Sequence, residues 1–519
     1  MSEAGKFHEF TGRDIPWLVD WQAAQRGDKI FLVWEPVDGT TESWTYAAFA
    51  EESRAYAAGL VAQGVTAGDT VVLHMGNRPE FLFAWHACAR LGALVVTTNT
   101  GSSADELGYF LTHSRASVVL TEQRFLSAIT EAGAALRWIA CIDGGEPATA
   151  SAYRLLPFAA LRGDPAGCPR RAPDPLRPGS VQYTSGTTSR PKGVVWTHAN
   201  ALWSGRTTAA HLHLTAEDVT LIHLPLFHTN ALGYSHMSTL WSGGTIVLTP
   251  GFSASRFWDV AARNRCTWAS QIGFTLTALL AQPRPAAHHF RFFASGSGGT
   301  ICQDNWGIAQ ISWYGSTETI SQNCHSDWRL PEAPGSMGRA AHEYEISIRD
   351  DAGREVGFGE CGHLYIGGVR GLSLFASYLH DEAATAAAFD VRGFYDTGDE
   401  VTPRADGEIF YASRAKDMLR VGGENVAALE IETVIMGVAG VREVAVVGKP
   451  HPLYQEVPVA FVVAKADGDG LVAAIKAQCT EKLAKFKRPW EVRLLDELPK
   501  GLLSKVLKKE LRAMAAAED

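Results

Sequence analysis

A hydroxyl-rich loop in the first half of the chain reads Tyr183-Thr184-Ser185-Gly186-Thr187-Thr188-Ser189-Arg190-Pro191-Lys192-Gly193. Its hydroxyl groups, backbone N–H groups and ammonium are the donors that a chain of phosphate oxygens requires. Glycine at two positions of the loop lets the backbone approach a ligand closely. The loop is not a P-loop, because no Ser or Thr follows Lys192. We therefore expect a phosphate-binding loop of another kind, although such clusters are also typical of plain surface linkers.

The composition excludes several classes of protein. A chain of 519 residues is longer than one core usually supports, which favours two or more domains. The net charge of −9 leaves no basic surface for nucleic acid. Eight cysteines without a C-x-x-C pair favour reduced thiols in a cytoplasmic protein over disulfides or a zinc site. We expect neither a signal peptide nor an integral membrane segment.

Apolar runs alternate with amphipathic ones between residues 29 and 143, and again between 221 and 264. We expect strands at 31–34, 71–75, 94–98, 118–121, 138–142, 221–226 and 245–248. The expected helices are 46–63, 78–91, 105–113, 124–136, 231–241 and 255–264, with Asn77 as a cap of the second and Gly92 at its end. This alternation predicts a layered α/β architecture with largely parallel strands. A proline-rich stretch at 163–179 predicts an irregular connector within it.

The last part of the chain predicts a smaller module. After a turn at 395–399 and a hairpin of 400–402 with 408–412, we expect a helix at 428–436 and strands at 441–448 and 457–464. A second helix at 470–485 and a strand at 491–495 complete it. About 100 residues are enough for a compact α+β domain. We therefore expect one domain at 1–413 and a second at 414–519.

Four further motifs follow the hydroxyl-rich loop. They are Trp313-Tyr314-Gly315-Ser316-Thr317-Glu318, Tyr395-Asp396-Thr397-Gly398-Asp399, Ser413-Arg414-Ala415-Lys416-Asp417 leading into Gly422-Gly423-Glu424-Asn425-Val426, and Pro499-Lys500-Gly501-Leu502-Leu503-Ser504-Lys505. In this order the motifs resemble the adenylate-forming (ANL) enzymes: acyl-CoA ligases, peptide-synthetase adenylation domains and luciferases. The residues of these motifs are most similar to those of the crotonobetaine/carnitine–CoA ligase branch. The resemblance covers residues 45–512 and implies a large N-terminal adenylation domain with layered α/β subdomains and a small, mobile α+β C-terminal domain.

The resemblance also implies ATP, Mg²⁺ and coenzyme A. Lys505 would be the catalytic cation that bridges the carboxylate and the α-phosphate, and Glu318 would offer Mg²⁺ a hard carboxylate oxygen. Plainer interpretations are a solvated basic helix end and a helix N-terminal glutamate. The residues implied for ATP and AMP are Thr184, Ser185, Gly186, Thr187, Thr188, Lys192, Gly296, Ser297, Gly298, Tyr314, Gly315, Ser316, Thr317, Asp399, Arg414 and Lys505.

The second half-reaction involves the C-terminal module. The resemblance implies a hinge at Lys416, where rotation would replace Lys505 with the face of Gly422 and Gly423 and open a tunnel for CoA. Lys487 would meet the CoA phosphates, unless it only solvates a helix end. Residues of the implied acyl pocket are Phe227, His228, Asn230, Tyr234, Gly273, Phe274, Trp313 and Ile320, with His228 as a catalytic gate or a structural histidine. This lining favours a hydrophobic or bulky acid.

Two departures from the family pattern leave alternatives open. Ser504 replaces the glycine that usually precedes the catalytic lysine, and the segment from Gly299 to Tyr314 is shorter than the family's helix-bearing one. The adenine wall around Gly296–Gly298 is therefore expected to differ. An acyl-CoA ligase is the interpretation we favour. The alternatives are an acyl-AMP ligase that loads a carrier-protein thiol and a family member that has lost adenylation. A homodimer is the base-rate expectation.

Overall fold

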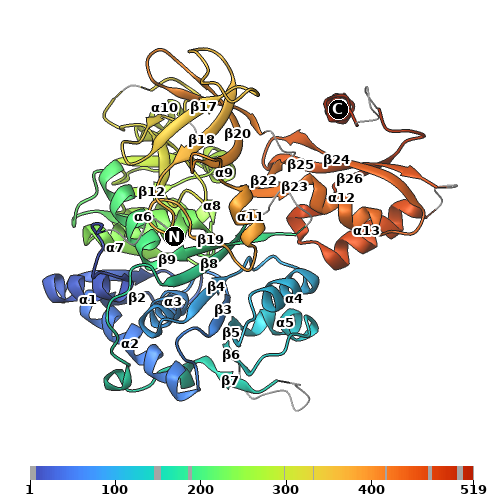
Figure 1. Ribbon diagram of the computed structural model, residues 1–519. Coiled ribbons are helices and arrows are strands. Elements are labelled where there is room, and N and C mark those ends of the chain that lie inside the picture. The colour runs from blue at the N-terminus through green and yellow to red at the C-terminus, as the bar shows by residue number, and fades with distance from the viewer. Residues whose placement is uncertain are drawn as a thin grey trace.

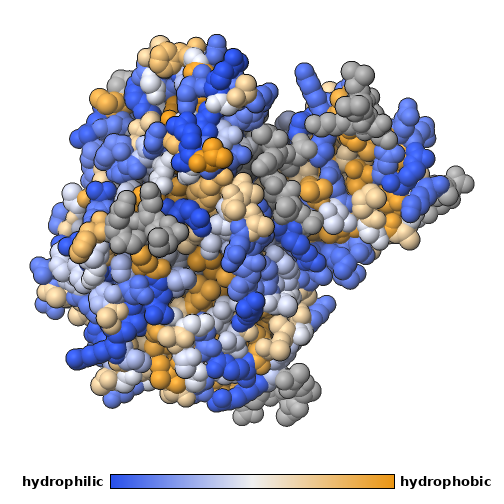
Figure 2. All heavy atoms as spheres, in the orientation of Figure 1, coloured by the Kyte–Doolittle hydropathy of each residue, from blue (hydrophilic) through white to orange (hydrophobic). Residues whose placement is uncertain are grey.

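The computed structural model describes residues 7–144, 153–184, 190–296, 298–330, 332–414, 418–465, 470–499 and 506–517. A large N-terminal body carries a smaller C-terminal body on one side (Figure 1). Both are mixed α/β structures, which confirms the predicted fold class. The space-filling view is hollowed between the upper part of the N-terminal body and the C-terminal body (Figure 2).

The first sheet of the N-terminal body has the strand order β19-β9-β8-β4-β3-β5-β6-β7. Its central strands are parallel, and β9 and β19 run antiparallel to their neighbours. Strands β3, β5 and β6 are buried along their whole length, which explains why they read as continuous apolar runs. The bounds are β3 (Thr70–His74), β4 (Leu94–Thr97), β5 (Val118–Glu122), β6 (Trp138–Ile142), β7 (Leu155–Pro157), β8 (Pro178–Thr184), β9 (Lys192–Thr197) and β19 (Ser377–Tyr378).

Four helices lie where the sequence predicts them, with shifted ends: α2 (Tyr46–Ala62), α3 (Pro79–Leu91), α4 (Ala104–His113) and α5 (Leu126–Glu131). The structure adds α1 (Ile15–Arg26), which was not predicted, and the short 3-10 turns η2 (Gln123–Phe125), η3 (Phe158–Leu161) and η4 (Pro165–Gly167). Gly92 ends α3 with a left-handed φ of 71°. Asn77 does not cap that helix: Arg78 holds the cap position, and the Asn77 side chain bonds Leu224 and Leu226 of another layer instead.

The second sheet has the order β16-β15-β14-β13-β12-β10-β11-β1-β2. Its strands are β1 (Ile30–Trp34), β2 (Glu42–Thr45), β10 (Val219–Ile222), β11 (Thr245–Leu248), β12 (Trp268–Ser270), β13 (Phe292–Ser295), β14 (Ala309–Gly315), β15 (Gln322–His325) and β16 (Arg339–Ala340). Its helices are α6 (His198–His211), α7 (Ser238–Ser242), α8 (Ala254–Arg263), α9 (Gly273–Leu280) and α10 (Ile301–Trp306). The helix expected at 231–241 is a π-helix, η5 (Asn230–Met237), that continues into α7. In the shortened segment, only α10 precedes β14.

A third sheet, β17-β18-β20-β21, completes the N-terminal body with β17 (Glu345–Arg349), β18 (Gly362–Gly367), β20 (Tyr395–Pro403) and β21 (Ile409–Arg414), beside α11 (Glu382–Ala387). Residues 395–399, expected as a turn, form the start of β20. The hairpin partners are therefore longer than predicted, because the ladder with β18 begins at Tyr395.

The C-terminal body is built on a sheet with the order β23-β22-β25-β24, in which β26 also pairs with β25. Its elements are β22 (Met418–Val421), β23 (Glu424–Ala427), α12 (Ala428–Met436), β24 (Val441–His451), β25 (Gln455–Ala464), α13 (Leu471–Lys482), η6 (Lys485–Lys487), β26 (Glu491–Leu494) and α14 (Lys508–Ala516). Apolar clusters lie on both faces of this sheet, separate from those of the N-terminal body. All eight cysteines lie in described parts of the chain as free thiols. In those parts, no helix combines the length and apolar character that crossing a bilayer requires.

Candidate active site

A cavity of about 800 Å³ lies where strand ends of the N-terminal body meet the first turn of the C-terminal body. Most of the predicted site residues that the structure describes border it. They are Thr184, Lys192, Phe227, His228, Asn230, Tyr234, Phe274, Gly296, Trp313, Tyr314, Gly315, Ser316, Thr317, Glu318, Asp399, Gly422 and Gly423. Elements far apart in sequence thus converge on one space. That is the usual arrangement at the carboxyl ends of parallel strands.

Several predicted residues lie outside the described part of the chain: Ser185, Gly186, Thr187, Thr188, Ser297, Lys416 and Lys505. For Arg414 the structure describes the backbone, which pairs with Asp399 across β20 and β21. Their predicted roles stay predictions.

Four other predicted residues do not border the cavity. Ile320 is fully buried in the core with a φ of 68°. Gly273 starts α9 and faces Gln455 of the C-terminal body, whereas Gly298 is held against Ser336 by a backbone hydrogen bond of 2.7 Å. Lys487 lies in a separate ionic contact described below.

Glu318 occupies the turn after β14, beside Thr184 at the end of β8. The carboxylate is 8% exposed, and its Oε1 accepts hydrogen bonds from Thr184 Oγ1 (3.3 Å) and the Tyr378 hydroxyl (3.2 Å). Burial and this carboxylate raise the pKa of Tyr378 above its ordinary value, so the phenol remains a donor. The Lys192 ammonium lies 4.7 Å from the centre of the Tyr378 ring. A carboxylate and a cation therefore both contact Tyr378 on the cavity wall, and such groups can bind a metal ion and phosphate oxygens respectively.

At the next part of the wall, the Tyr314 hydroxyl donates a short hydrogen bond to Oδ2 of Asp399. Asp399 is 4% exposed, and its backbone N–H donates to Thr397 Oγ1 (3.1 Å). β14 supplies the aromatic ring and β20 the carboxylate, so two sheets fix the pair. An aromatic face beside a buried carboxylate suits a base and the hydroxyls of its ribose.

The C-terminal body closes the cavity with the turn that precedes β23. Glu424 accepts from His228 Nε2 at 2.9 Å and 3.0 Å, and from Asn99 Nδ2 at 3.3 Å. Although burial alone would lower the pKa of His228, Glu424 raises it above the ordinary value. In the same way burial would raise the pKa of Glu424, but His228 lowers it. Gly422 and Gly423 have φ angles of 60° and 92°, which favour glycine. His228 and Glu424 therefore form a charged contact between the two bodies at the border of the cavity.

Lys487 forms a second contact between the bodies, away from the cavity. Its ammonium lies 2.6 Å from Oε1 of Glu106 on α4 and 2.8 Å from Oε1 of Glu430 on α12. Less than a tenth of each of the three side chains is exposed. Burial alone would lower the pKa of Lys487, but the two carboxylates raise it. In this arrangement its ammonium is paired with these two carboxylates, and its predicted contact with the CoA phosphates stays a prediction.

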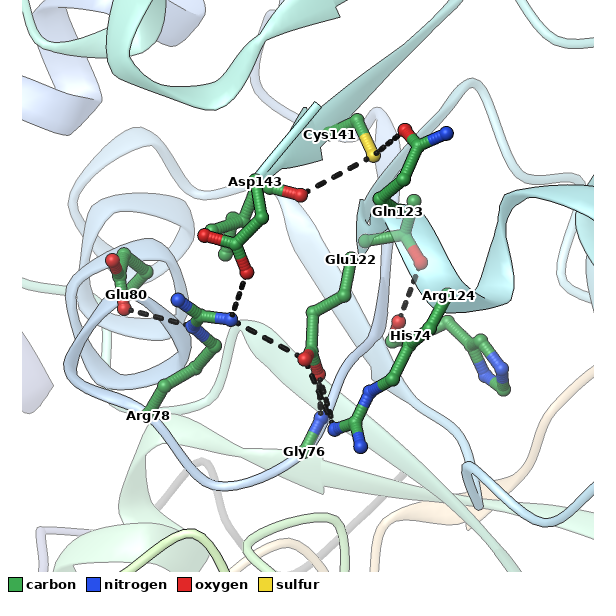
Figure 3. Close-up of polar contacts among 11 residues, drawn as sticks. His74, Gly76, Arg78, Glu80, Glu122, Gln123, Arg124, Cys141 and Asp143 are labelled. Carbon is green, nitrogen blue, oxygen red and sulfur yellow. Dashed lines mark hydrogen bonds and ion pairs between the residues drawn. The ribbon is translucent and has the colours of Figure 1, made fainter. Parts of the chain in front are cut away.

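One part of the cavity wall was not expected from the sequence. Gly76 and Asn77, which come shortly after β3, border the cavity, and Oε1 of Glu122 accepts a hydrogen bond from the Gly76 N–H at 2.7 Å (Figure 3). Arg78 contacts Glu122 at 3.3 Å and Asp143 at 3.0 Å. The signal that could have revealed them is their position, since strands β3, β5 and β6 are parallel neighbours and end together.

The chain matches two models of one enzyme family. The family model "AMP-binding enzyme" matches residues 19–379, and the model "AMP-binding enzyme C-terminal domain" matches residues 430–505. The crotonobetaine/carnitine–CoA ligase of Salmonella paratyphi C is 30% identical over 96% of this chain and 99% of its own length.

Solved structures are similar over the whole chain. The o-succinylbenzoate CoA synthetase of Bacillus subtilis has a TM-score of 0.81 at 28% identity, covering 96% of this chain and 98% of its own. The anthranilate CoA ligase AuaEII has a TM-score of 0.72 at 26% identity, covering 99% of both chains. The chain belongs to the AMP-binding enzyme family, within its acyl-CoA synthetase branch of AMP-forming acid–thiol ligases.

Proposed function

We propose that this enzyme activates a hydrophobic or bulky carboxylic acid as its acyl-adenylate and then transfers the acyl group to coenzyme A. In the first step a carboxylate oxygen attacks the α-phosphorus of ATP, and the bond to pyrophosphate breaks. In the second step the CoA thiolate attacks the acyl carbon, and the bond to the AMP oxygen breaks. AMP leaves with that oxygen, so atoms and charge balance over both steps.

The observation that carries this proposal is the meeting of three groups on one cavity. Glu318 with Lys192 suits the phosphates, Tyr314 with Asp399 suits adenosine, and the Gly422–Glu424 turn brings glycine backbone from the other body to the same space. Two adjacent glycines leave room for a thin ligand to pass along the backbone. Adenylation and thiolysis would then share one acyl pocket.

The proposed roles follow from charge. Lys192 would bind phosphate oxygens, and Asp399 would accept hydrogen bonds from the ribose hydroxyls. Mg²⁺ would be held by Glu318 together with phosphate oxygens and would neutralise charge on the triphosphate. A single carboxylate fits that use, because Mg²⁺ at phosphate sites is usually bound by one or two carboxylates together with substrate phosphates and waters.

The two steps would use different orientations of the C-terminal body. The orientation of the structure, with Glu424 against His228, corresponds in our proposal to thioester formation. Rotation about Lys416 would bring Lys505 to the carboxylate and α-phosphate for the first step. We propose this alternation because Gly422 and Gly423 border the cavity in the present orientation, whereas the family resemblance implies that Lys505 enters the same cavity for the first step.

The acyl pocket supports an acid with a large apolar part. Phe227, Phe274 and Trp313 border the cavity, and Phe252 and Ile272 add to them. Burying apolar acyl surface against such side chains supplies roughly 25 cal/mol per Å². A short acid such as acetate would leave much of this surface unused.

The test is a panel of carboxylic acids with MgATP. We expect acid-dependent exchange of labelled pyrophosphate into ATP, and formation of acyl-CoA and AMP when CoA is added. Glu318→Gln should lower the exchange roughly hundredfold, whereas Glu345→Gln, at an exposed position of β17, should not. Absence of exchange with every acid would refute the proposal. Exchange followed by transfer only to a carrier-protein phosphopantetheine would refute its second step.

A further inference from the structure

Two polar side chains lie side by side in a part of the cavity that the proposed steps do not use. His223 and Gln271 follow the neighbouring parallel strands β10 and β12 and both border the cavity. Thr220 is level with Trp268 and Leu221 with Ala269, so the same register places His223 level with Gln271. Their exposed fractions are 3% and 0%. The sheet therefore places an imidazole and an amide together in the cavity wall.

These side chains keep unused hydrogen-bonding atoms. Within the part of the chain that the structure describes, both ring nitrogens of His223 and Nε2 of Gln271 have no partner. The rest of Gln271 is fixed: its Oε1 accepts from Thr275 Oγ1 at 2.7 Å, and its backbone N–H donates to the Ala294 carbonyl at 2.7 Å. Buried polar atoms are nearly always paired in folded proteins, because leaving them unpaired is costly. His223 and Gln271 border the same cavity and together have three atoms of this kind, two ring nitrogens and one amide nitrogen. We take them to indicate a ligand group that forms hydrogen bonds with them.

The character of the two side chains limits what that group can be. His223 is surrounded by the rings of Phe252 and Phe257, at 5.4 Å and 5.2 Å between centroids. Burial lowers its pKa to about 3, so the imidazole is neutral and offers one donor and one acceptor. In the described structure, no Lys, Arg, Asp or Glu from β10, β12 or the loops directly after them borders the cavity. The charged residues that do border the cavity, such as Lys192, Arg420 and Glu424, come from other elements. A hydroxyl or carbonyl oxygen could accept from Gln271 and pair with the neutral His223.

The position relative to the nucleotide residues sets where the group lies on the substrate. β13 separates β12 from β14, whose end carries Tyr314 and Gly315. Two strand spacings, about 10 Å, therefore separate Gln271 from this end of β14, and three spacings, about 14 Å, separate His223 from it. An acid whose carboxylate reaches the adenylation site would therefore place the far end of its acyl chain, not its α-carbon, at His223 and Gln271.

We propose that His223 and Gln271 select a carboxylic acid that carries an uncharged oxygen, as a hydroxyl or carbonyl group, near the far end of an otherwise apolar acyl chain. This inference rests on the proposed function and narrows its substrate class. Sites that hydrogen-bond a substrate oxygen discriminate strongly against analogues that lack it, because the protein atoms are then left unpaired.

The test compares matched acids in the acyl-CoA assay: a series of graded chain length, each with and without a terminal-region hydroxyl or keto group. We expect the wild type to prefer the oxygenated member at the fitting length by about a hundredfold or more in kcat/KM. Gln271→Met and His223→Phe, which approximately keep the side-chain volumes, should each reduce that preference at least tenfold. Ser270→Ala is the matched control. Its buried hydroxyl also has no partner in the described structure, but it does not border the cavity, so the preference should stay unchanged.

The outcomes separate the two proposals. If the wild type makes acyl-CoA but shows equal or better turnover of the apolar acids, or if neither substitution changes the preference, this inference is wrong while the proposed function stands. If no acid of either series gives acyl-adenylate or acyl-CoA, the proposed function fails and the inference fails with it. Two separate substitutions keep the test decisive if one variant does not fold.

Discussion

Removing the negative charge of Glu106 should slow thioester formation while leaving adenylation intact. Glu106 lies on α4 of the N-terminal body, and its carboxylate is 2.6 Å from the ammonium of Lys487 in the C-terminal body. The contact is almost completely buried and is flanked by a 3.0 Å hydrogen bond from Ser103 Oγ to the Lys482 carbonyl. It therefore stabilises the orientation in which the Gly422–Glu424 turn faces the cavity.

The substitution Glu106→Gln isolates the charge. Glutamine can still accept from the Ser103 N–H in the capping box of α4, so the helix start is kept. Breaking a buried ion pair costs about 3–5 kcal/mol. Since Glu430 remains beside Lys487, we take the lower figure, about 3 kcal/mol, which shifts the orientation equilibrium roughly hundredfold.

The assay follows the two half-reactions separately. Pyrophosphate exchange reports adenylation, and transfer from a supplied acyl-adenylate to CoA reports the second step. We expect transfer to fall by up to a hundredfold and exchange to change little. The control is Asp105→Asn on the same helix. Its contacts with Arg190 (3.4 Å) and Lys482 (3.7 Å) are partly exposed, so they should contribute less than about 1 kcal/mol. Unchanged transfer in Glu106→Gln, or an equal fall in both steps, would refute the reasoning.

Three further predictions concern the cavity. The pKa of His228 is raised and that of Glu424 is lowered. Their contribution to the closed orientation is therefore complete between about pH 4.5 and pH 6.5. It is lost as pH rises through the raised pKa of His228, and also as pH falls through the lowered pKa of Glu424. Small-angle scattering should show that the radius of gyration of the wild type depends on pH, and His228→Gln should remove this dependence. A wild-type radius of gyration that does not change with pH would contradict the prediction. Tyr314→Phe, which leaves Asp399 without its short hydrogen bond, should raise the KM for ATP about tenfold. An unchanged KM would place the nucleotide elsewhere. Lys505→Ala should slow pyrophosphate exchange about 10²–10³-fold, and exchange at the wild-type rate would remove that lysine from the first step.

The layered fold was predictable because local patterns carry it. Strands β3, β5 and β6 of the first sheet are buried on both faces and read as apolar runs, and Gly92 marks the end of α3 as expected. The π-helix at Asn230–Met237 could not be predicted from the sequence, because its wider turn leaves the apolar pattern of a helix almost unchanged. Likewise Asn77 looked like a helix cap, but its partners lie in a layer formed 147 residues later.

Site residues divide in the same way. Those in contiguous motifs, such as Tyr314 and Glu318, could be predicted by resemblance and do border the cavity. The buried ion pair of Lys487 could not be predicted, because the carboxylate that it contacts in the other body is 381 residues away in the sequence. A basic cluster in the sequence also gives no sign that one of its members is buried. His223 and Gln271 carry no motif, and only the pairing of β10 with β12 places them together.

The central claim, that the acid passes through an acyl-adenylate, is tested most directly by following carboxylate oxygen. An acid labelled with heavy oxygen at both carboxylate positions would be incubated with the enzyme, MgATP and CoA, and the products analysed by mass spectrometry. The proposed chemistry predicts one heavy oxygen in AMP, one in the thioester carbonyl and none in pyrophosphate. Heavy oxygen in orthophosphate with release of ADP, or unlabelled AMP beside the thioester, would contradict it.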